Sequence, residues 1–544
     1  MTSREARPAV PWSRIEAAAL ALVLLVSIGL RAPLAREPLW VDELHTGWVV
    51  THGLDDLPAH ARAGNQSPLW FYLPWLSTRL AENAFCLRLP SLLAGIALPL
   101  LIYGAARRLL GSPPAALLAA LLAALDPQFA FYATEARGYS WVQALAVLHL
   151  TAWLTGHADQ FSTRQRILWI ATGVALFYLH YTTALILAAE LAWDTLTLLT
   201  RPSSPGTTRR AIDYLLVALS CLPTIPHLRS IAGHRTDWSQ ALTADSAWTL
   251  FPWYSHLLAP LILGLVLTAW RWKSGRQPVC WLPRARLVAG LGVWIVGPWL
   301  IALICTSTDT AQLLRYRYLI ASATALPLIA ALAFVSLPES VSRLSLATLV
   351  VILAGYHHVP FRQWLSTGSW PLERSEFWEL AVDRLNAAPR SDTPVLLCPA
   401  LVEDRRLART PSAAEPPESL VDFCRFPLDS LYRLTTPASR VHPLATLERP
   451  RLSTVVRDQI TAARGARLVV RGDAELARHI VRELAWELAA AQRTVAARPA
   501  TTLGQVTIVE LQISTAARPV AGPPPPPKKT APSEELAPTE KPGR

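Results

Sequence analysis

The sequence predicts an all-α polytopic membrane protein of about 11 transmembrane helices, followed by a C-terminal extracytoplasmic α/β domain. Of its 544 residues, 52% are hydrophobic and 17% are charged, against about 25% charged residues in ordinary soluble chains. The charge is also uneven, because residues 1–360 hold 44 of the 90 charged residues and residues 361–544 hold the other 46. This pattern excludes a purely soluble enzyme and a disordered regulator, and six cysteines are too few for a disulfide scaffold.

The apolar runs set the predicted spans, because a membrane-crossing helix needs roughly 20 apolar residues. We predict spans at 17–30, 86–106, 113–131, 139–155, a pair within 167–199, 211–228, 247–270, 287–304, 318–336 and 344–360. Arginines recur at alternate ends of these runs, so the positive-inside rule places the N-terminus in the cytoplasm and the C-terminal part outside. The net charge of +12 therefore reflects topology and does not indicate nucleic-acid binding. Because so many spans follow, we interpret the first run as a retained anchor and not as a signal peptide.

Composition divides the chain into four parts. We expect a cytoplasmic N-terminus at 1–15, a membrane domain at 16–360 with a first outer loop at 31–84, an α/β domain at 361–515 and a disordered Pro-rich tail at 516–544. The aromatic stretch Ser67–Leu80 in the first outer loop is too short to span comfortably, so we place it at the membrane interface.

The C-terminal part alternates helical and strand patterns, which favours a small layered α/β sandwich. The predicted elements are helix Ser375–Asn386, strand Val395–Cys398, helix Arg451–Ala463, strand Leu468–Arg471, helix Ala474–Ala491 and strand Gln505–Leu511. Cys398 and Cys424 both fall in this part, outside the membrane. Whether they form a disulfide stays open, because sequence does not show their geometry.

Polar clusters stand at the outer ends of four separate spans. They are Asp42, Glu43 and His45 after the first span, Glu135, Arg137 and Tyr139 in the second outer loop, His180 in a tight turn, and Arg315 and Arg317 before the span at 318–336. Arginines suit a phosphate, and a carboxylate suits removal of a proton from a hydroxyl. Such a layer favours a reaction between one lipid-anchored and one water-side substrate.

Each cluster also has an ordinary interpretation. An acidic loop at a helix end, an interfacial ion pair, a snorkelling arginine and a hydrogen-bonded turn histidine would explain them one at a time. Glu190 is the one ionisable residue that we place near the bilayer midplane, and we interpret it as a structural pair within the bundle.

Five motifs in register carry a resemblance to a known superfamily. They are Trp40-x-Asp42-Glu43-x-x-Thr46, Phe85-x-x-Arg88-Leu89-Pro90-Ser91-Leu92, Tyr132-x-x-Glu135-Ala136-Arg137-x-Tyr139, Leu179-His180-Tyr181 and Arg317-Tyr318-Leu319. Over about residues 15–335 the chain resembles the GT-C integral-membrane glycosyltransferases, in particular bacterial members of the dolichyl-phosphate-mannose protein mannosyltransferase and lipid A aminoarabinose transferase group. Each motif alone is weak, and the set says little about substrate.

The resemblance implies a mechanism and roles for the residues. It implies transfer of a sugar from a polyprenyl-phosphate donor to an acceptor hydroxyl at the outer face of the bacterial cytoplasmic membrane, with inversion. Asp42 matches the general base and Glu43 the neighbour that orients acceptor or base. The donor phosphate is assigned to Glu135, Arg137, Tyr139, Arg315 and Arg317, and acceptor or metal contacts to His45 and His180. The sugar and the acceptor, whether a glycan, a lipid or a protein, are not specified.

Two points of the resemblance stay open. Many relatives have Pro-Pro before the aromatic run of the first loop, where this chain has Gln66, Ser67 and Pro68. Some relatives use a divalent cation and others do not, and the spacing of Asp42, His45, Glu135 and His180 does not define a metal site. We therefore assign no required cofactor beyond the lipid-linked donor, and a divalent cation stays open.

Three other functions compete with the transferase. An oligosaccharide polymerase or ligase would also place arginines and carboxylates outside, but such proteins usually have their large outer loop in mid-chain. A transporter or flippase for a lipid-linked sugar predicts inverted repeats and broken midplane helices, and the spans show no inverted repeat. A sensor or assembly factor is the third alternative, because nothing shows what the C-terminal domain binds.

Overall fold

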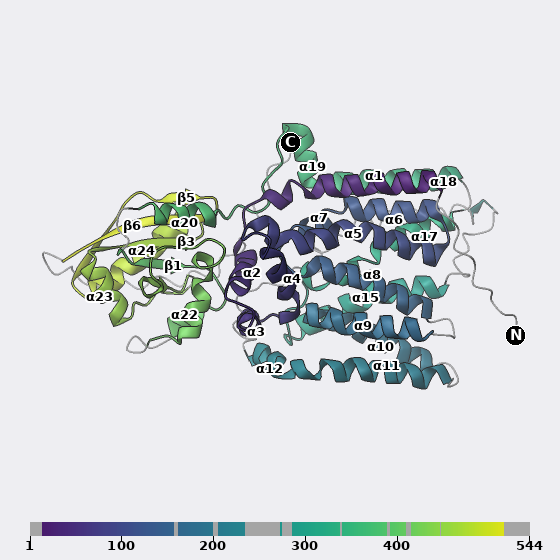
Figure 1. The fold of residues 1–544 in the computed structure, drawn as a ribbon, viewed down its shortest axis with the longest axis horizontal. Helices are drawn as coiled ribbons and strands as arrows, with labels where there is room; N and C mark the ends of the chain where they lie inside the picture. Colours follow the sequence, from purple (N-terminus) through teal and green to yellow (C-terminus); the bar gives the residue numbers. More distant parts are fainter. Residues whose placement is uncertain are drawn as a thin grey trace.

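The protein is described by a computed structural model in which a helix bundle and a sheet lie end to end (Figure 1). The described residues are 13–156, 162–199, 205–233, 273–274, 285–337, 340–388, 392–409, 415–446 and 448–515. The predicted span 247–270, the N-terminal residues 1–12 and the predicted tail 516–544 lie outside them. The predicted fold class, a helical membrane bundle with a C-terminal α/β part, is confirmed.

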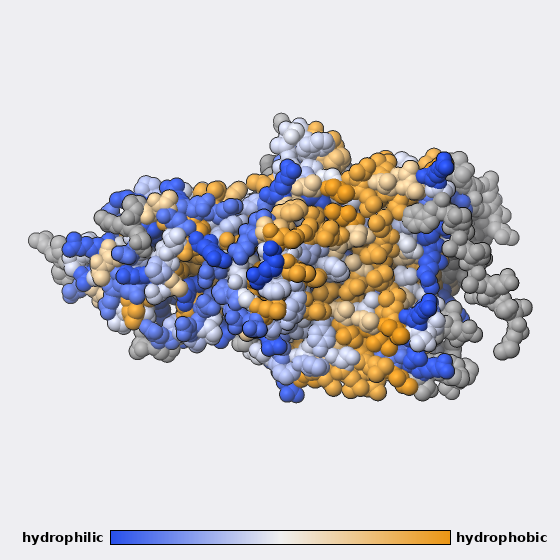
Figure 2. Space-filling view, in the orientation of Figure 1, coloured by the Kyte–Doolittle hydropathy of each residue, from blue (hydrophilic) through white to orange (hydrophobic). Residues whose placement is uncertain are grey.

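The bundle runs from α1 to α18. Its described helices are α1 (Arg14–Arg31), α5 (Ala84–Leu110), α6 (Pro113–Leu125), α7 (Pro127–Ala133), α8 (Tyr139–Gly156), α9 (Thr163–Leu179), α10 (Ala184–Leu199), α11 (Pro205–Cys221), α12 (Ile225–Gly233), α15 (Ala285–Ser307), α16 (Ile320–Ala323), α17 (Leu326–Ser336) and α18 (Ser340–His357). On the face seen in Figure 2, apolar residues cover the bundle and polar residues lie toward both of its ends. The bundle therefore has the surface of a membrane domain.

Fewer helices meet a simple criterion for spanning than the 11 that the sequence predicts. Among the described residues, five are long and apolar enough to cross a membrane, or up to seven if each of two bent pairs is one span. The predicted spans at 139–155 and in the first half of 167–199 correspond to α8 and α9, which are not among these five. The count of 11 stays a prediction.

One predicted span is sharply bent in the structure, and another is shorter than predicted. The span predicted at 113–131 is the pair α6 and α7, bent by 61°. Asp126 makes the break, because its side chain accepts hydrogen bonds from Gln128 and Phe129 and so starts a new helix with Pro127 at its first position. The span predicted at 318–336 contains α16 and α17, which together form one short apolar stretch, Ile320–Ser336, with Pro327 in the first turn of α17.

Short helices fill loop 31–84, between the bundle and the sheet (Figure 1). They are the 3₁₀ turns η1 (Leu34–Arg36) and η2 (Pro68–Phe71) and the helices α2 (Val41–Thr51), α3 (Leu57–Ala63) and α4 (Tyr72–Thr78). The aromatic stretch Ser67–Leu80 thus forms η2 and α4. Leu44, Trp48 and Val49 of α2 share one hydrophobic cluster with Phe423 and Phe426 of the C-terminal part, so loop 31–84 and the sheet pack as neighbours.

The C-terminal part, here called the sheet region (residues 378–515), follows α19 (Val359–Thr367). Its helices are α20 (Trp378–Asn386), α21 (Arg405–Arg409), α22 (Glu418–Arg425), α23 (Thr454–Ala462) and α24 (Ala474–Ala489), and its strands are β1 (Val395–Cys398), β2 (Val441–Pro443), β3 (Gly465–Arg471), β4 (Arg493–Ala497), β5 (Thr501–Leu503) and β6 (Val506–Thr515). The strand order is β2-β1-β3-β6-β4, with β5 beside β6. Strands β2, β1 and β3 are parallel, and β6 runs antiparallel to β3 and β4.

The six predicted elements of this region all exist. Strand Val395–Cys398 has the predicted bounds, and each of the other five is shifted at one or both ends. The helix expected from Ser375 begins at Trp378, because Ser375 and Glu376 pair with the turn at Gly504 and Gln505 instead. Strands β2, β4 and β5 were not predicted, and β2 and β5 have three residues each. Cys398 and Cys424 are buried, free thiols, so they form no disulfide.

Candidate active site

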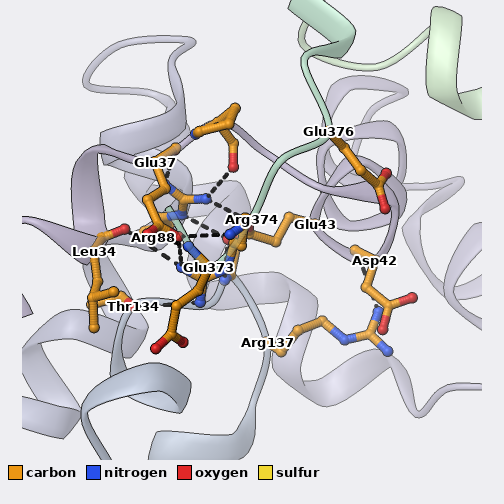
Figure 3. A network of polar contacts seen from close by, with 12 residues as sticks. Leu34, Glu37, Asp42, Glu43, Arg88, Thr134, Arg137, Glu373, Arg374 and Glu376 are labelled. Atoms are coloured by element: carbon orange, nitrogen blue, oxygen red, sulfur yellow. Dashed lines mark hydrogen bonds and ion pairs between the residues drawn. The ribbon is translucent and has the colours of Figure 1, made fainter. Parts of the chain in front are cut away.

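Asp42 lies where three distant segments meet, at the end of the bundle that faces the sheet region. It stands in the first turn of α2, and its side chain is 30% exposed. Its Oδ2 is 3.8 Å from Nη1 of Arg317, which belongs to η7 (Tyr316–Tyr318). Nη1 of Arg137, from the loop between α7 and α8, donates to the backbone carbonyl of Asp42 over 3.2 Å. Figure 3 shows the Arg137 side chain extending to Asp42.

The surrounding arginines keep the Asp42 carboxylate ionised. Burial alone would raise its pKa, but the positive charges of Arg137, Arg317 and Arg471 outweigh burial and lower the pKa below its ordinary value. Asp42 is therefore an anion at neutral pH. An ionised, partly exposed carboxylate has the state that a general base requires.

Glu43 is adjacent to Asp42 in sequence but faces the protein interior. Its carboxylate accepts from Nε of Arg88 at 2.7 Å and from Nη2 of Arg88 at 2.5 Å, and the side chains of both residues are fully buried. The backbone N–H of Ala136 also donates to it, over 2.9 Å. Glu43 thus fastens α2 to α5 and to the loop between α7 and α8, and protein groups occupy both of its oxygens.

Arg88 gathers the first part of loop 31–84. Besides Glu43, it donates to the backbone carbonyls of Ala35, Glu37 and Pro38 at 3.1, 2.5 and 3.0 Å. The sequence placed Arg88 in a motif without giving it a role. The signal for one was its position, since an arginine inside an apolar helix must find partners when it is buried.

Glu135 differs from Glu43 because one of its carboxyl oxygens has no hydrogen-bond partner. It is 1% exposed, and its Oε2 accepts no hydrogen bond. Burial raises its pKa to about 8, although Arg374 and Arg137 oppose the shift. Glu135 is therefore predominantly protonated at neutral pH. A protonated carboxyl can donate a hydrogen bond, which a carboxylate cannot.

Arg137 is held from two sides. Its backbone carbonyl accepts from the hydroxyl of Ser91 on α5 over 2.8 Å. With the Gln66 amide turned so that its oxygen faces the guanidinium, that oxygen accepts from both Nη atoms at 2.7 Å. The sequence did not identify Gln66 as a ligand of Arg137.

Aromatic rings line the side of the site next to Arg317. The ring of Tyr139, at the start of α8, lies 5.6 Å from that of His180, which lies 5.9 Å from the ring of Tyr318. His180 caps the end of α9, and its Nδ1 is 2.7 Å from the hydroxyl of Thr182. Arg315 precedes η7, two residues before Arg317. The structure thus brings Tyr139, His180 and Arg317 together.

His45 lies away from the open side of the site. It is 3% exposed, and its ring packs within 6 Å of the rings of Trp48, Phe71, Phe423 and Phe426. Burial lowers its pKa to about 3, so the ring is neutral. In the part of the chain that the structure describes, no three His, Cys, Asp or Glu side chains form a group that could hold a metal ion.

The sequence missed the contribution of Arg374. This residue belongs to the linker, residues 368–377, which joins α19 to α20, and it is 3% exposed. Its Nη1 pairs with Glu37 at 3.2 Å, and its Nη2 donates to the carbonyl of Phe131 and the hydroxyl of Thr134 at 3.1 and 3.3 Å. Figure 3 shows Arg374 and Arg88 in one network with Glu37 and Glu43.

A cavity of about 200 Å³ lies between α3 and the sheet region. Among the residues that line it are Arg62, Asn65, Glu403, Arg406 and Phe423. The Asn65 amide donates to Glu403 over 3.3 Å. Burial raises the pKa of Glu403 to about 7, and the charge of Asp42 contributes to that rise.

Comparison with known proteins gives one family match and similar folds. Residues 65–229 match the family described as dolichyl-phosphate-mannose-protein mannosyltransferase, and no curated protein sequence matches the chain. The structure is similar to the crystal structure of apo ArnT from Cupriavidus metallidurans, with a TM-score of 0.52 and 14% identity over 91% of this chain and 97% of that chain.

Two further structures are less similar. ArnT from the same organism bound to undecaprenyl phosphate gives a TM-score of 0.47 at 12% identity, covering 91% of this chain and 97% of that chain. The archaeal oligosaccharyltransferase AglB from Archaeoglobus fulgidus gives 0.47 at 11% identity, covering 84% and 69%. This multi-pass membrane protein thus matches the mannosyltransferase family model over residues 65–229 and is similar in fold to apo ArnT.

Proposed function

We propose that the protein transfers a sugar from a polyprenyl-phosphate donor to an acceptor hydroxyl at the extracytoplasmic face of the cytoplasmic membrane, with inversion at the anomeric carbon. The observation that carries this proposal is the meeting of Asp42 with Arg137 and Arg317. A carboxylate and two guanidinium groups from three separate segments share one small space. A base for the acceptor and cations for a phosphate are the groups that this reaction needs.

The chemistry follows from these charges. Asp42 takes the proton of the acceptor hydroxyl while the oxygen of that hydroxyl bonds to the anomeric carbon of the sugar. The bond between that carbon and the phosphate oxygen breaks, and its electron pair leaves with the polyprenyl phosphate. Arg137 and Arg317 stabilise the charge on this leaving group, because guanidinium donors bind phosphate in charge-assisted pairs. Attack from the side opposite the phosphate inverts the anomeric carbon.

The states of the neighbouring groups support this division of roles. Asp42 and Arg317 are partly exposed, at 30% and 26%, whereas Glu43 is enclosed by Arg88. Only the first pair is open to a substrate, so Glu43 acts by holding α2. The cavity at Arg62, Asn65 and Glu403 lies on the side from which we expect the acceptor to approach, with the donor lipid at the bundle. The class of acceptor and the sugar are not specified by these contacts.

One buried residue argues against a transporter. Glu190 is the candidate for an ion-relay group in the bundle, and it is fully buried. Its carboxylate accepts from the indoles of Trp294 and Trp169 at 2.8 and 3.1 Å and lies 3.3 Å from Nε2 of His149. A carboxylate with all of these partners has the surroundings of a structural group and not of a relay.

The direct test measures transfer from radiolabelled polyprenyl-phosphate sugars in native membranes, which contain the acceptor. Asp42→Asn should lower the rate by roughly 10²- to 10⁴-fold, the usual contribution of a general base. Glu82→Gln, an exposed carboxylate in the same loop, is the matched control and should transfer like the wild type. Equal rates for Asp42→Asn and the wild type would refute the base assignment.

The phosphate assignment has its own test. Arg137→Gln should raise the donor concentration needed for half-saturation, roughly tenfold to a hundredfold, since a hydrogen bond to a charged group contributes about 1.5–3 kcal/mol. Arg79→Gln, an exposed arginine of loop 31–84, serves as the control. Unchanged donor saturation in Arg137→Gln would contradict the assignment.

A further inference from the structure

The N-terminus of α2, the helix that carries Asp42, is capped by a residue from a distant part of the sequence. The backbone N–H of Val41 donates to Oε2 of Glu376 over 3.0 Å, and the two residues are 335 positions apart. Trp40, at the cap position itself, makes no side-chain capping bond. A helix start without a local cap needs an acceptor from elsewhere, and Glu376 supplies it one residue before Asp42.

Glu376 is itself fixed by the sheet region. It is 3% exposed, and its Oε2 also accepts from the indole of Trp378 at 2.8 Å. Its Oε1 accepts from Nε and Nη2 of Arg471, at the end of β3, at 2.9 and 2.7 Å. Glu376 therefore makes a bidentate pair with a strand on one side and a hydrogen bond to α2 on the other. Figure 3 shows its side chain beside the segment that carries Asp42.

The backbone of the linker around Glu376 also contacts the sheet region. Gln505 donates to the carbonyl of Ser375 over 2.8 Å, and Glu376 bridges to Gly504. Gly504 has a φ of +61°, and a Cβ there would meet the Ser375 carbonyl. Glycine at this turn thus permits the close approach that places Glu376.

We infer that Glu376 and Arg471 are positioning residues for the transfer reaction, through which the sheet region sets the place and charge surroundings of Asp42. This inference rests on the proposed role of Asp42 as the base. Glu376 acts on position through the Val41 N–H. Arg471 acts on charge, since it is one of the cations that lower the pKa of Asp42.

Several other charged groups face Asp42 and enter its titration. They are Arg137 and Arg317, which lower its pKa, and Glu135, Tyr139 and Glu403, whose own pKa values its charge affects. The neighbouring His45 is neutral and adds no charge. Arg471 and Glu376 carry opposite charges. Removing the charge of one or of the other therefore shifts the pKa of Asp42 in opposite directions. Loss of Arg471 favours protonated Asp42, whereas loss of the Glu376 charge favours ionised Asp42.

The test uses the full-length protein in native membranes with radiolabelled polyprenyl-phosphate sugars, and compares kcat with donor KM. Glu376→Ala should lower kcat by about tenfold or more and leave donor KM unchanged, because a misplacement of about 1 Å can cost roughly 10²-fold. Glu376→Gln retains an oxygen that can accept from Val41 and should recover most of kcat. It also keeps the test open if Glu376→Ala does not fold.

The pH profile separates positioning from a loss of structure. Arg471→Gln removes a positive charge and should raise the pKa of Asp42, which moves the acidic limb of the kcat profile toward higher pH. Glu376→Gln removes a negative charge, so it should not move the limb in that direction. Glu82→Ala is the matched control, since Glu82 pairs with Arg433 at 3.2 Å and so also joins loop 31–84 to the sheet region, far from α2 in sequence. It should leave kcat unchanged.

The outcomes distinguish the two proposals. If Asp42→Asn keeps full activity, the proposed function fails and with it the basis of the inference. If Asp42→Asn is inactive but Glu376→Ala has wild-type kcat, or loses no more than Glu82→Ala, the inference alone fails. An unshifted acidic limb in Arg471→Gln would overturn the charge role of Arg471.

Discussion

Glu135 combines burial, an unpaired oxygen and a raised pKa, which makes it the residue whose titration should most affect stability. Its pKa is about 8 in the folded protein against an ordinary value of 4.5. Between these two values the unfolded chain binds fewer protons than the folded one, so this group costs stability progressively as the pH rises. Below about pH 4.5 the cost disappears, because both states are protonated.

Glu135→Gln should therefore remove a pH-dependent cost. We expect the variant to raise Tm relative to the wild type at about pH 9 and to change it little at about pH 5. Thermal unfolding in detergent at the two pH values measures this difference. The opposite ranking, with the larger gain at the lower pH, would mean that Glu135 is ionised in the folded protein.

The sequence predicted the candidate-site residues that belong to local motifs and missed the contacting residues that do not. Asp42, Arg137, Tyr139, His180 and Arg317 were recognisable because each is a polar residue at the end of an apolar run. Arg374 and Glu376 lie in a part of the chain where charged residues are common, so nothing local marks them. Their importance comes from contacts with residues more than 300 positions away, which a single sequence does not reveal.

At the scale of elements, the pair of Glu43 and Arg88 joins α2 to α5. Breaking a buried pair on one side leaves an uncompensated charge, which costs about 3–5 kcal/mol, whereas replacing both members with apolar residues is often tolerated. Glu43→Leu and Arg88→Met should each destabilise the protein strongly, and the double variant should lose less than the two singles combined.

A double-mutant cycle of unfolding in detergent measures this coupling. The exposed pair of Arg498 and Glu510, at 2.9 Å, offers a control cycle in which we expect a coupling of no more than about 1 kcal/mol. Strict additivity for Glu43 and Arg88 would show that the two side chains do not depend on one another.

The break in the span predicted at 113–131 has a cause that is visible in the sequence. Asp126 followed by Pro127 is a helix-start signal inside an apolar run. The continuous span at 113–131 was predicted from hydrophobicity alone, which does not take this signal into account. The short strands β2 and β5 had no signal of comparable strength. Three residues do not establish an alternating pattern, and pairing to longer neighbours stabilises them instead.

At the scale of the whole molecule, the two ends of the bundle should lie on opposite sides of a membrane. Thr163 starts α9 at the end away from the sheet region, and Asp473 is an exposed residue that precedes α24. In intact cells, a cysteine at Asp473 should react with a membrane-impermeant thiol reagent, and a cysteine at Thr163 should react only after permeabilisation. The reverse pattern would invert the proposed orientation.

The hydrogen bond between Val41 and Glu376 can form only after the ribosome has synthesised residue 376. The ribosome adds about 5–20 residues per second, so the 335 residues between them take roughly 20 to 70 s to emerge. For that interval the nascent chain holds its first helices in the lipid while the segment with Asp42 still lacks its cap. A polypeptide released before residue 376 would insert without acquiring the finished site.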